Sequence, residues 1–146
     1  MEKVIQCLKN LIKGTEYENH VYIIGGCLRD QTITNDVDIV LDIEDYIGFC
    51  KHMTEKTKCR SLYNPFIEKS KHTAMFSFSS IPELSDIKFD VNMARKNKEY
   101  ELGTMEENFY TNMDFTCNSL WYNVTTDELT DYSGKAVGDI KDKILR

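Results

Sequence analysis

The sequence predicts an α/β or α+β fold in which a mixed central sheet is flanked by helices. Several short runs alternate between apolar and polar residues, as half-buried strands do, and other stretches repeat apolar residues at helical spacing. Because the two kinds of run interleave irregularly, the strands are expected to form one mixed sheet. The 146 residues, 41% of them hydrophobic, predict a single domain over 1–146 and exclude collagen-like, coiled-coil and disordered chains.

Charge and cysteine content narrow the class of protein further. Lys and Arg number 18 against 24 Asp and Glu, a net charge of −6, which argues against strong sequence-independent binding of nucleic acid. Any RNA contact is therefore expected to be local or supplied by a partner chain. No apolar run reaches the roughly 18 residues of a membrane helix, and five cysteines without a C-x-x-C pair indicate reduced thiols. We expect a cytoplasmic protein without membrane contact.

The first elements follow from periodicity and glycine. Residues 4–12 place apolar side chains on one helical stripe, and Gly14 is expected to end that helix. Residues 21–24 (VYII) form a β-rich run that stops at Gly25 and Gly26, after which CLRDQTI has a helical pattern. This segment predicts a strand, a glycine turn and the start of a helix.

The later elements are predicted in the same way. LWYN and ELTDY around TTD are expected to form a small hairpin. The remaining expectations are strands at 37–41, 59–63, 72–78 and 87–94, a helix at 43–57, and a mostly helical stretch at about 105–122.

Two acids on one of these strands are the first candidates for chemistry. Asp36 and Asp38 are two residues apart, so an extended strand points both carboxylates to the same side, about 7 Å apart along the chain. Two such groups can bracket a divalent cation such as Mg²⁺, which takes carboxylate and phosphate oxygens. Acids also alternate on ordinary solvent-facing strands, so the pair alone leaves both readings open.

The surroundings of this pair strengthen the catalytic interpretation. The acids follow the glycine pair by about ten residues, and a helix beginning there could present backbone N–H groups to phosphates. In IKFDVNMA, Asp90 lies on the opposite side from the apolar residues, as Asp38 does in its own strand. If the two strands are neighbours, three carboxylates meet.

These residues resemble the tRNA nucleotidyltransferase and bacterial poly(A) polymerase family of the DNA polymerase β-like nucleotidyltransferase superfamily. GGCLRD followed by DVD is similar to the family signature G-G-x-[VL]-R-D…D-x-D. Three later segments are similar to family segments in the same order: FDVNMARKNKEY, MDFTCNSLWYN and LTDYSGKAVGDIKDKILR. The resemblance runs from about residue 21 to 146 and implies the DNA polymerase β-like fold of a head domain, without the neck and body that follow it in the family.

The resemblance also implies roles for individual residues. Asp36, Asp38 and Asp90 would be catalytic and would hold Mg²⁺ or Mn²⁺, while an acceptor hydroxyl attacks the α-phosphorus of an NTP, ATP or CTP. An RNA or tRNA 3′ end is the expected acceptor, with a separate RNA-binding chain as a further expected partner. The nucleotide-binding residues implied by the same motifs are Gly25, Gly26, Arg29, Arg95, Asp114 and Asn118.

The sequence departs from the family at one place that matters for activity. Asn112 and Met113 stand where the family has two arginines, and losing two charge-assisted contacts of about 1.5 to 3 kcal/mol each would weaken nucleotide binding. These substitutions leave open a catalytically silent nucleotide-binding or partner module. The resemblance to the head domain without neck and body leaves open a nucleotidyltransferase that acts on a protein or small molecule.

Overall fold

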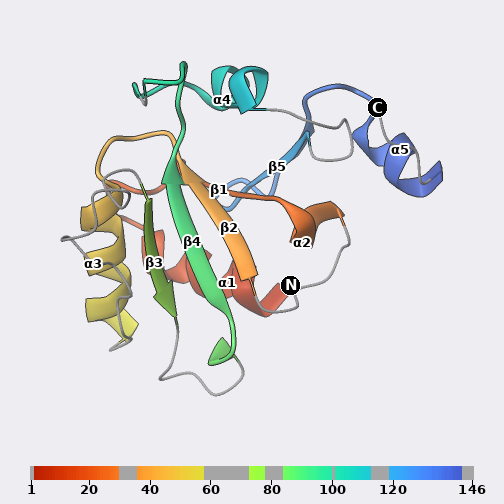
Figure 1. The fold of residues 1–146 in the computed structure, drawn as a ribbon. Helices are drawn as coiled ribbons and strands as arrows, with labels where there is room; N and C mark the ends of the chain where they lie inside the picture. The colour runs from red at the N-terminus through yellow and green to blue at the C-terminus, as the bar shows by residue number, and fades with distance from the viewer. Residues whose placement is uncertain are drawn as a thin grey trace.

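The computed structural model describes residues 2–29, 36–57, 73–77, 84–99, 101–112 and 119–142. Its centre is a six-stranded sheet in the order β3-β4-β2-β1-β5-β6 (Figure 1). The strands are β1 (Val21–Ile24), β2 (Asp36–Leu41), β3 (Thr73–Ser77), β4 (Lys88–Met93), β5 (Leu120–Asn123) and β6 (Leu129–Asp131). The helices are α1 (Glu2–Ile12), α2 (Gly26–Arg29), α3 (Tyr46–Thr57), α4 (Met105–Asn112) and α5 (Ala136–Asp142).

The sheet is mixed, as the sequence predicts. β2 pairs with β4 in parallel, whereas β1 with β2, β1 with β5, β3 with β4 and β5 with β6 pair antiparallel. The parallel pair lies near the middle of the sheet, with β1 on one side of it and β3 on the other. Two strands that are about fifty residues apart in the chain are therefore direct neighbours.

One face of the sheet carries the main hydrophobic core. The inward residues of β2 and β4 are fully buried together with the apolar stripe of α1 and with α3. Fully buried side chains of this core include Leu8, Ile12, Val21, Ile23, Val37, Ile39, Leu41, Phe49, Met53, Phe89 and Val91. Gly14 adopts a φ of 75° just after α1, a left-handed conformation that glycine adopts without strain, which confirms the predicted end of the helix.

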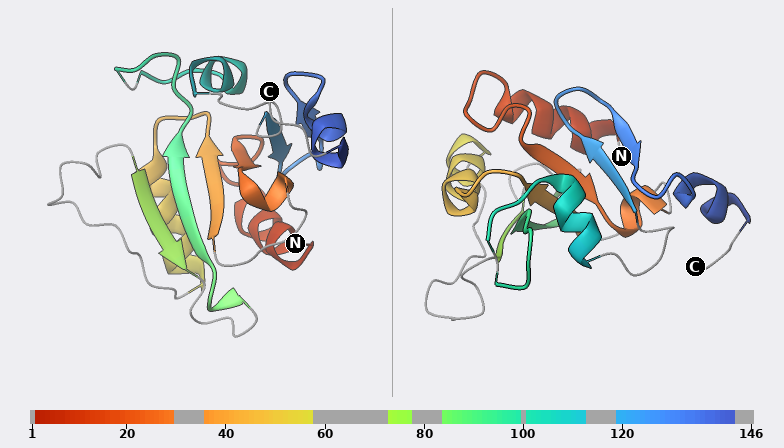
Figure 2. Two further views of the ribbon diagram at one scale, coloured as in Figure 1. Left: turned by 45° about the vertical axis from the view of Figure 1, so that its right-hand side comes forward. Right: turned by 90° about the horizontal axis from the view of Figure 1, so that it is seen from above.

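On the opposite face, the described residues form a second, smaller hydrophobic cluster. α4 lies over the ends of β2 and β4, as Figures 1 and 2 show, and packs into a smaller aromatic cluster. Phe109 and Trp121 lie 4.9 Å apart there, between ring centroids. α4 begins with a reciprocal cap, in which the Glu107 N–H donates to Thr104 Oγ1 at 3.2 Å and the Thr104 N–H donates to Glu107 Oε1 at 3.0 Å.

Two predicted boundaries are corrected by the structure. α3 begins at Tyr46 rather than residue 43, because the Asp45 carboxylate accepts the Gly48 N–H at 3.0 Å and so caps the helix there. The predicted end of the helical stretch at residue 122 is wrong, because 120–123 form β5 and pair antiparallel with β1 and β6; the described part of the helix is α4, Met105–Asn112. The hairpin prediction is confirmed, whereas the strand predicted at 59–63 lies outside the described residues.

None of the helices in the described ranges is both long enough and apolar enough to cross a membrane.

Candidate active site

The parallel pairing of β2 with β4 places the predicted acids on neighbouring strands. Asp38 and Asp90 are register partners, and Asp36 pairs with Lys88 two residues earlier. Since adjacent strands lie about 4.8 Å apart and side chains alternate between faces, the three carboxylates share the side opposite the main core. The expectation that the two acid-bearing strands are neighbours is confirmed.

The glycine turn after β1 lies directly against one of these acids. Ile24 is the antiparallel partner of Asp38, and Gly25 follows it with a φ of 87°. A Cβ placed on Gly25 would lie only 2.6 Å from Asp38 Oδ2. Gly26 then begins α2, so the predicted order of strand, glycine turn and helix is present. The backbone conformation favours glycine here, and the absence of a Cβ lets the carboxylate lie close to the turn.

The electrostatics of the acids follow from their burial and proximity. Desolvation by burial, with repulsion from Asp90 and Asp36, raises the pKa of Asp38. Burial and the charge of Asp36 likewise raise the pKa of Asp90, and the Lys88 ammonium opposes this shift. Both carboxylates are half-buried. Concentrated negative charge of this kind is stabilised by a cation, which relieves the repulsion.

The donor set suits a hard divalent ion that is shared with a substrate. In the described part of the chain, no group of three or more His, Cys, Asp or Glu side chains is gathered closely enough to hold a metal ion alone. Mg²⁺, however, is usually held by one or two carboxylates together with substrate phosphates and water rather than by an all-protein cage. The mutual repulsion of Asp36, Asp38 and Asp90 therefore fits a cation whose coordination a phosphate would complete.

Lys88 is a residue of this site that sequence reasoning missed. It starts β4, is exposed, and lies across from Asp36 on the same side as Asp90. The alternation in IKFDVNMA contained the signal, because that pattern places Lys88 and Asp90 two residues apart on one side of the strand. Attention to acids alone left the lysine out.

Arg95 lies beyond the far end of β4, next to α4. Its backbone N–H donates to Asn108 Oδ1 at 3.1 Å, and its backbone forms an isolated bridge with Leu102. Asn108 is 8% exposed, so α4 supplies a buried acceptor that fixes the chain at Arg95. Sequence reasoning also missed Asn108, since a polar residue in a helix carries no sign of burial until the helix is docked.

The remaining predicted nucleotide-binding residues are not described in full. Arg29 ends α2, but its side chain is outside the description. Asp114 and Asn118 lie outside the described residues, and so does Met113. Asn112 is the last residue of α4, and its side chain is likewise not described. Their roles stay predictions.

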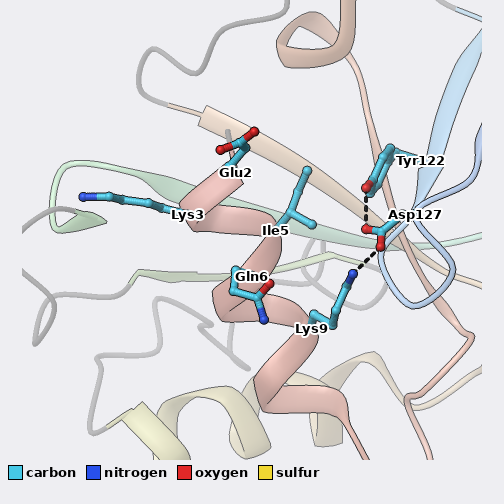
Figure 3. A pocket seen from close by; sticks show the side chains of 7 residues that line it. All are labelled: Glu2, Lys3, Ile5, Gln6, Lys9, Tyr122 and Asp127. Atoms are coloured by element: carbon cyan, nitrogen blue, oxygen red, sulfur yellow. Dashed lines mark hydrogen bonds and ion pairs between the residues drawn. The ribbon is translucent and has the colours of Figure 1, made fainter.

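A separate hollow of about 470 Å³ lies beside α1, away from the acids (Figure 3). One wall is a polar chain in which Tyr122 Oη donates to Asp127 Oδ1 at 2.5 Å and Lys9 forms an ion pair with the same carboxylate. These contacts link α1 to the turn between β5 and β6.

Trp121 is 5% exposed and packs in the aromatic cluster, so it is a core residue.

Comparisons with known proteins agree with this geometry. Residues 21–146 match the family model described as the poly A polymerase head domain. The tRNA nucleotidyltransferase cca1 of Schizosaccharomyces pombe is 27% identical over 88% of this chain, and the mitochondrial CCA tRNA nucleotidyltransferase of Saccharomyces cerevisiae is 27% identical over all of it. The chain spans about a third of the length of these relatives, 29% of the first and 32% of the second.

Solved structures show the same fold. A tRNA nucleotidyltransferase complexed with a primer tRNA and an incoming ATP analog superposes with a TM-score of 0.69, at 26% identity, over 87% of this chain and 35% of that chain. A tRNA-processing enzyme with CTP superposes with a TM-score of 0.65, at 27% identity, over 87% of this chain and 32% of that one. The predicted nucleotidyltransferase fold with a mixed central sheet is confirmed.

Proposed function

This chain belongs to the poly A polymerase head domain family, and we propose on that premise that it transfers a nucleoside monophosphate from ATP or CTP to the 3′ hydroxyl of an RNA, with tRNA as the favoured acceptor. The observation that carries the proposal is the placement of Asp36, Asp38 and Asp90 on neighbouring strands beside the glycine turn. The proposal treats 1–146 as a single catalytic head domain that works in the cytoplasm.

Each residue has a defined task in this proposal. The turn at Gly25 and Gly26 lets the backbone approach the triphosphate closely. Asp36, Asp38 and Asp90 hold Mg²⁺ or Mn²⁺, which when bound offsets the charge that develops on the α-phosphate and on the leaving pyrophosphate. The bond from the acceptor oxygen to the α-phosphorus forms as the bond to the bridging oxygen of pyrophosphate breaks, and the acceptor's proton is released.

The arginine and asparagine positions complete the nucleotide site. Arg29 and Arg95 would neutralise phosphate charge, for which the bidentate guanidinium is suited. Asp114 and Asn118 would contact the incoming nucleotide and its ribose. In the solved relatives, tRNA with an ATP analog and CTP are bound to the proteins that this fold resembles, which supports RNA and NTP as substrates here. A separate RNA-binding chain is a further part of the proposal.

The test is pyrophosphate release with Mg²⁺, each α-labelled NTP in turn and bulk tRNA. We expect label on the tRNA and a loss of about a hundredfold or more in rate when Asp36→Ala and Asp38→Ala are combined. The control is Asp42→Asn, because Asp42 follows β2 but is paired with His20 Nδ1 at 2.6 Å and with Tyr22 Oη at 3.2 Å. Turnover that survives in the double variant would refute the proposal.

A second candidate is a silent nucleotide-binding or partner module, favoured by Asn112 and Met113 in place of the family's arginines. The same experiment separates it, because it predicts NTP binding without pyrophosphate release. Label that appears on protein or on a small molecule, rather than on tRNA, would instead indicate a nucleotidyltransferase with another acceptor.

A further inference from the structure

We infer that Lys88 binds a backbone phosphate of the acceptor RNA strand and so positions its 3′ end beside the three acids. The inference rests on the proposed function and goes beyond it, since it assigns the side of the site from which the acceptor arrives. Lys88 is then a positioning residue for the acceptor and makes no contact with the NTP.

The first support is the place of Lys88 in the sheet. It is the register partner of Asp36, and it stands two residues before Asp90 on the same strand, so all three side chains lie on one side. Its side chain is exposed at the start of β4. An ammonium on a flexible stem at this point can reach an anion that approaches the acids from solvent.

The second support is that Lys88 and the glycine turn lie on opposite sides of β2, the strand that carries Asp36 and Asp38. The strand order is β4-β2-β1, so β2 with Asp36 and Asp38 lies between Lys88 on β4 and Gly25 after β1. In-line phosphoryl transfer places the attacking and leaving oxygens on opposite sides of the phosphorus. If the glycine turn holds the triphosphate, an acceptor that arrives from the β4 side, where Lys88 lies, meets this requirement.

The third support is charge. The chain carries −6 overall, so an RNA strand would be repelled along its backbone unless a cation beside the metal-binding acids met one of its phosphates. Among the described residues, Lys9 and Lys96 are paired with Asp127 and Glu101, whereas no ion pair of Lys88 is found in those ranges.

The experiment compares Lys88→Met and Lys88→Arg with wild type. Lys88→Met should raise the KM for tRNA about tenfold, with the KM for NTP and kcat changed less than about twofold, and Lys88→Arg should restore most of the loss. The slope of log affinity for tRNA against log salt should fall by about 1 for one lost phosphate contact. The control is Lys13→Met, an exposed lysine just after α1.

Fluorescence anisotropy with labelled tRNA makes the result independent of turnover. If wild type binds tRNA but releases no pyrophosphate, the proposed function fails, and the comparison of the variants' tRNA affinities still decides the role of Lys88. Three outcomes would overturn the inference: an increase in the KM for NTP alone, an equal loss of affinity in Lys13→Met, or no tRNA binding by wild type.

Discussion

Replacing Gly25 with alanine tests whether the glycine turn exists to make room for Asp38. Gly25 has a φ of 87°, and a Cβ built there would lie 2.6 Å from Asp38 Oδ2. Gly14 offers a matched control, because its φ is 75° but nothing lies within 4 Å of its added Cβ. Both substitutions impose the same backbone strain, and only Gly25→Ala also displaces a carboxylate of the site.

Backbone strain should change mainly the stability, whereas displacement of the Asp38 carboxylate should change mainly the rate. An alanine in the left-handed region costs about 1 to 2 kcal/mol, which should lower Tm by roughly 3 to 8 °C in either variant of this 146-residue chain. The clash adds little to the free energy of unfolding, since the end of a side chain can rotate away. It moves a catalytic oxygen by about 1 Å, however, and a misplacement of that size costs about a hundredfold in rate.

Urea unfolding followed by the fluorescence of the buried Trp121 gives the stability of each variant, and pyrophosphate release gives its activity. We expect Gly25→Ala and Gly14→Ala to be destabilised alike and only Gly25→Ala to lose activity. Equal activities in the two variants would show that the contact with Asp38 has no catalytic importance, and the reasoning would be refuted.

Two further predictions concern carboxylates with opposite roles. The pKa of Asp38 is raised above its ordinary 3.8 by burial and by the charges of Asp90 and Asp36, so its ionised form opposes folding, and stability falls as pH rises through the folded-state pKa. In EDTA, Asp38→Asn should therefore raise the free energy of unfolding at pH 7 by about 0.5 to 1 kcal/mol. Urea titrations at lower pH should show this gain becoming smaller. A gain that is the same at every pH would argue against charge repulsion as its cause. Asp131 instead caps α5, because its carboxylate accepts the Ala136 and Val137 N–H groups, both at 3.1 Å. Asp131→Ala should lower the free energy of unfolding by about 1 to 2 kcal/mol and change kcat by less than a factor of three. A large loss of kcat without a change in Tm would contradict a capping role.

Local patterns predicted most of the fold because each element carries its own signal. The alternation in β2 and β4 and the apolar stripe of α1 are visible in single segments, and the structure has all three. Two boundaries were wrong for different reasons. Residues 120–122 fitted both a helix and the first strand of a hairpin, and pairing with β1 and β6 decides for the strand. The start of α3 differs by three residues because of the local cap from Asp45.

Local patterns likewise predicted part of the candidate site and missed another part. The spacing of Asp36 and Asp38 predicts that their carboxylates share a side of one strand, but nothing local to the sequence predicts that β4 lies beside β2 in register. The alternation in IKFDVNMA made Asp90 a candidate, the resemblance to a known family implied its role, and the register then identified Lys88. Asn108 needed the docked helix, because its buried bond to the Arg95 N–H joins residues thirteen positions apart.

The two faces of the sheet explain how the fold tolerates a cluster of acids that repel one another. One face packs the main core against α1 and α3, and it contains the largest fully buried side chains, such as Phe49 and Phe89. That core stabilises β2 and β4 from one face, so the acids on the other face need not contribute to folding. Among the described elements, α4 and the aromatic cluster cover one end of that other face, where Asp38 and Asp90 are half-buried. Partial burial strengthens their interaction with a cation or a phosphate-bound metal, while the core behind them compensates for their repulsion.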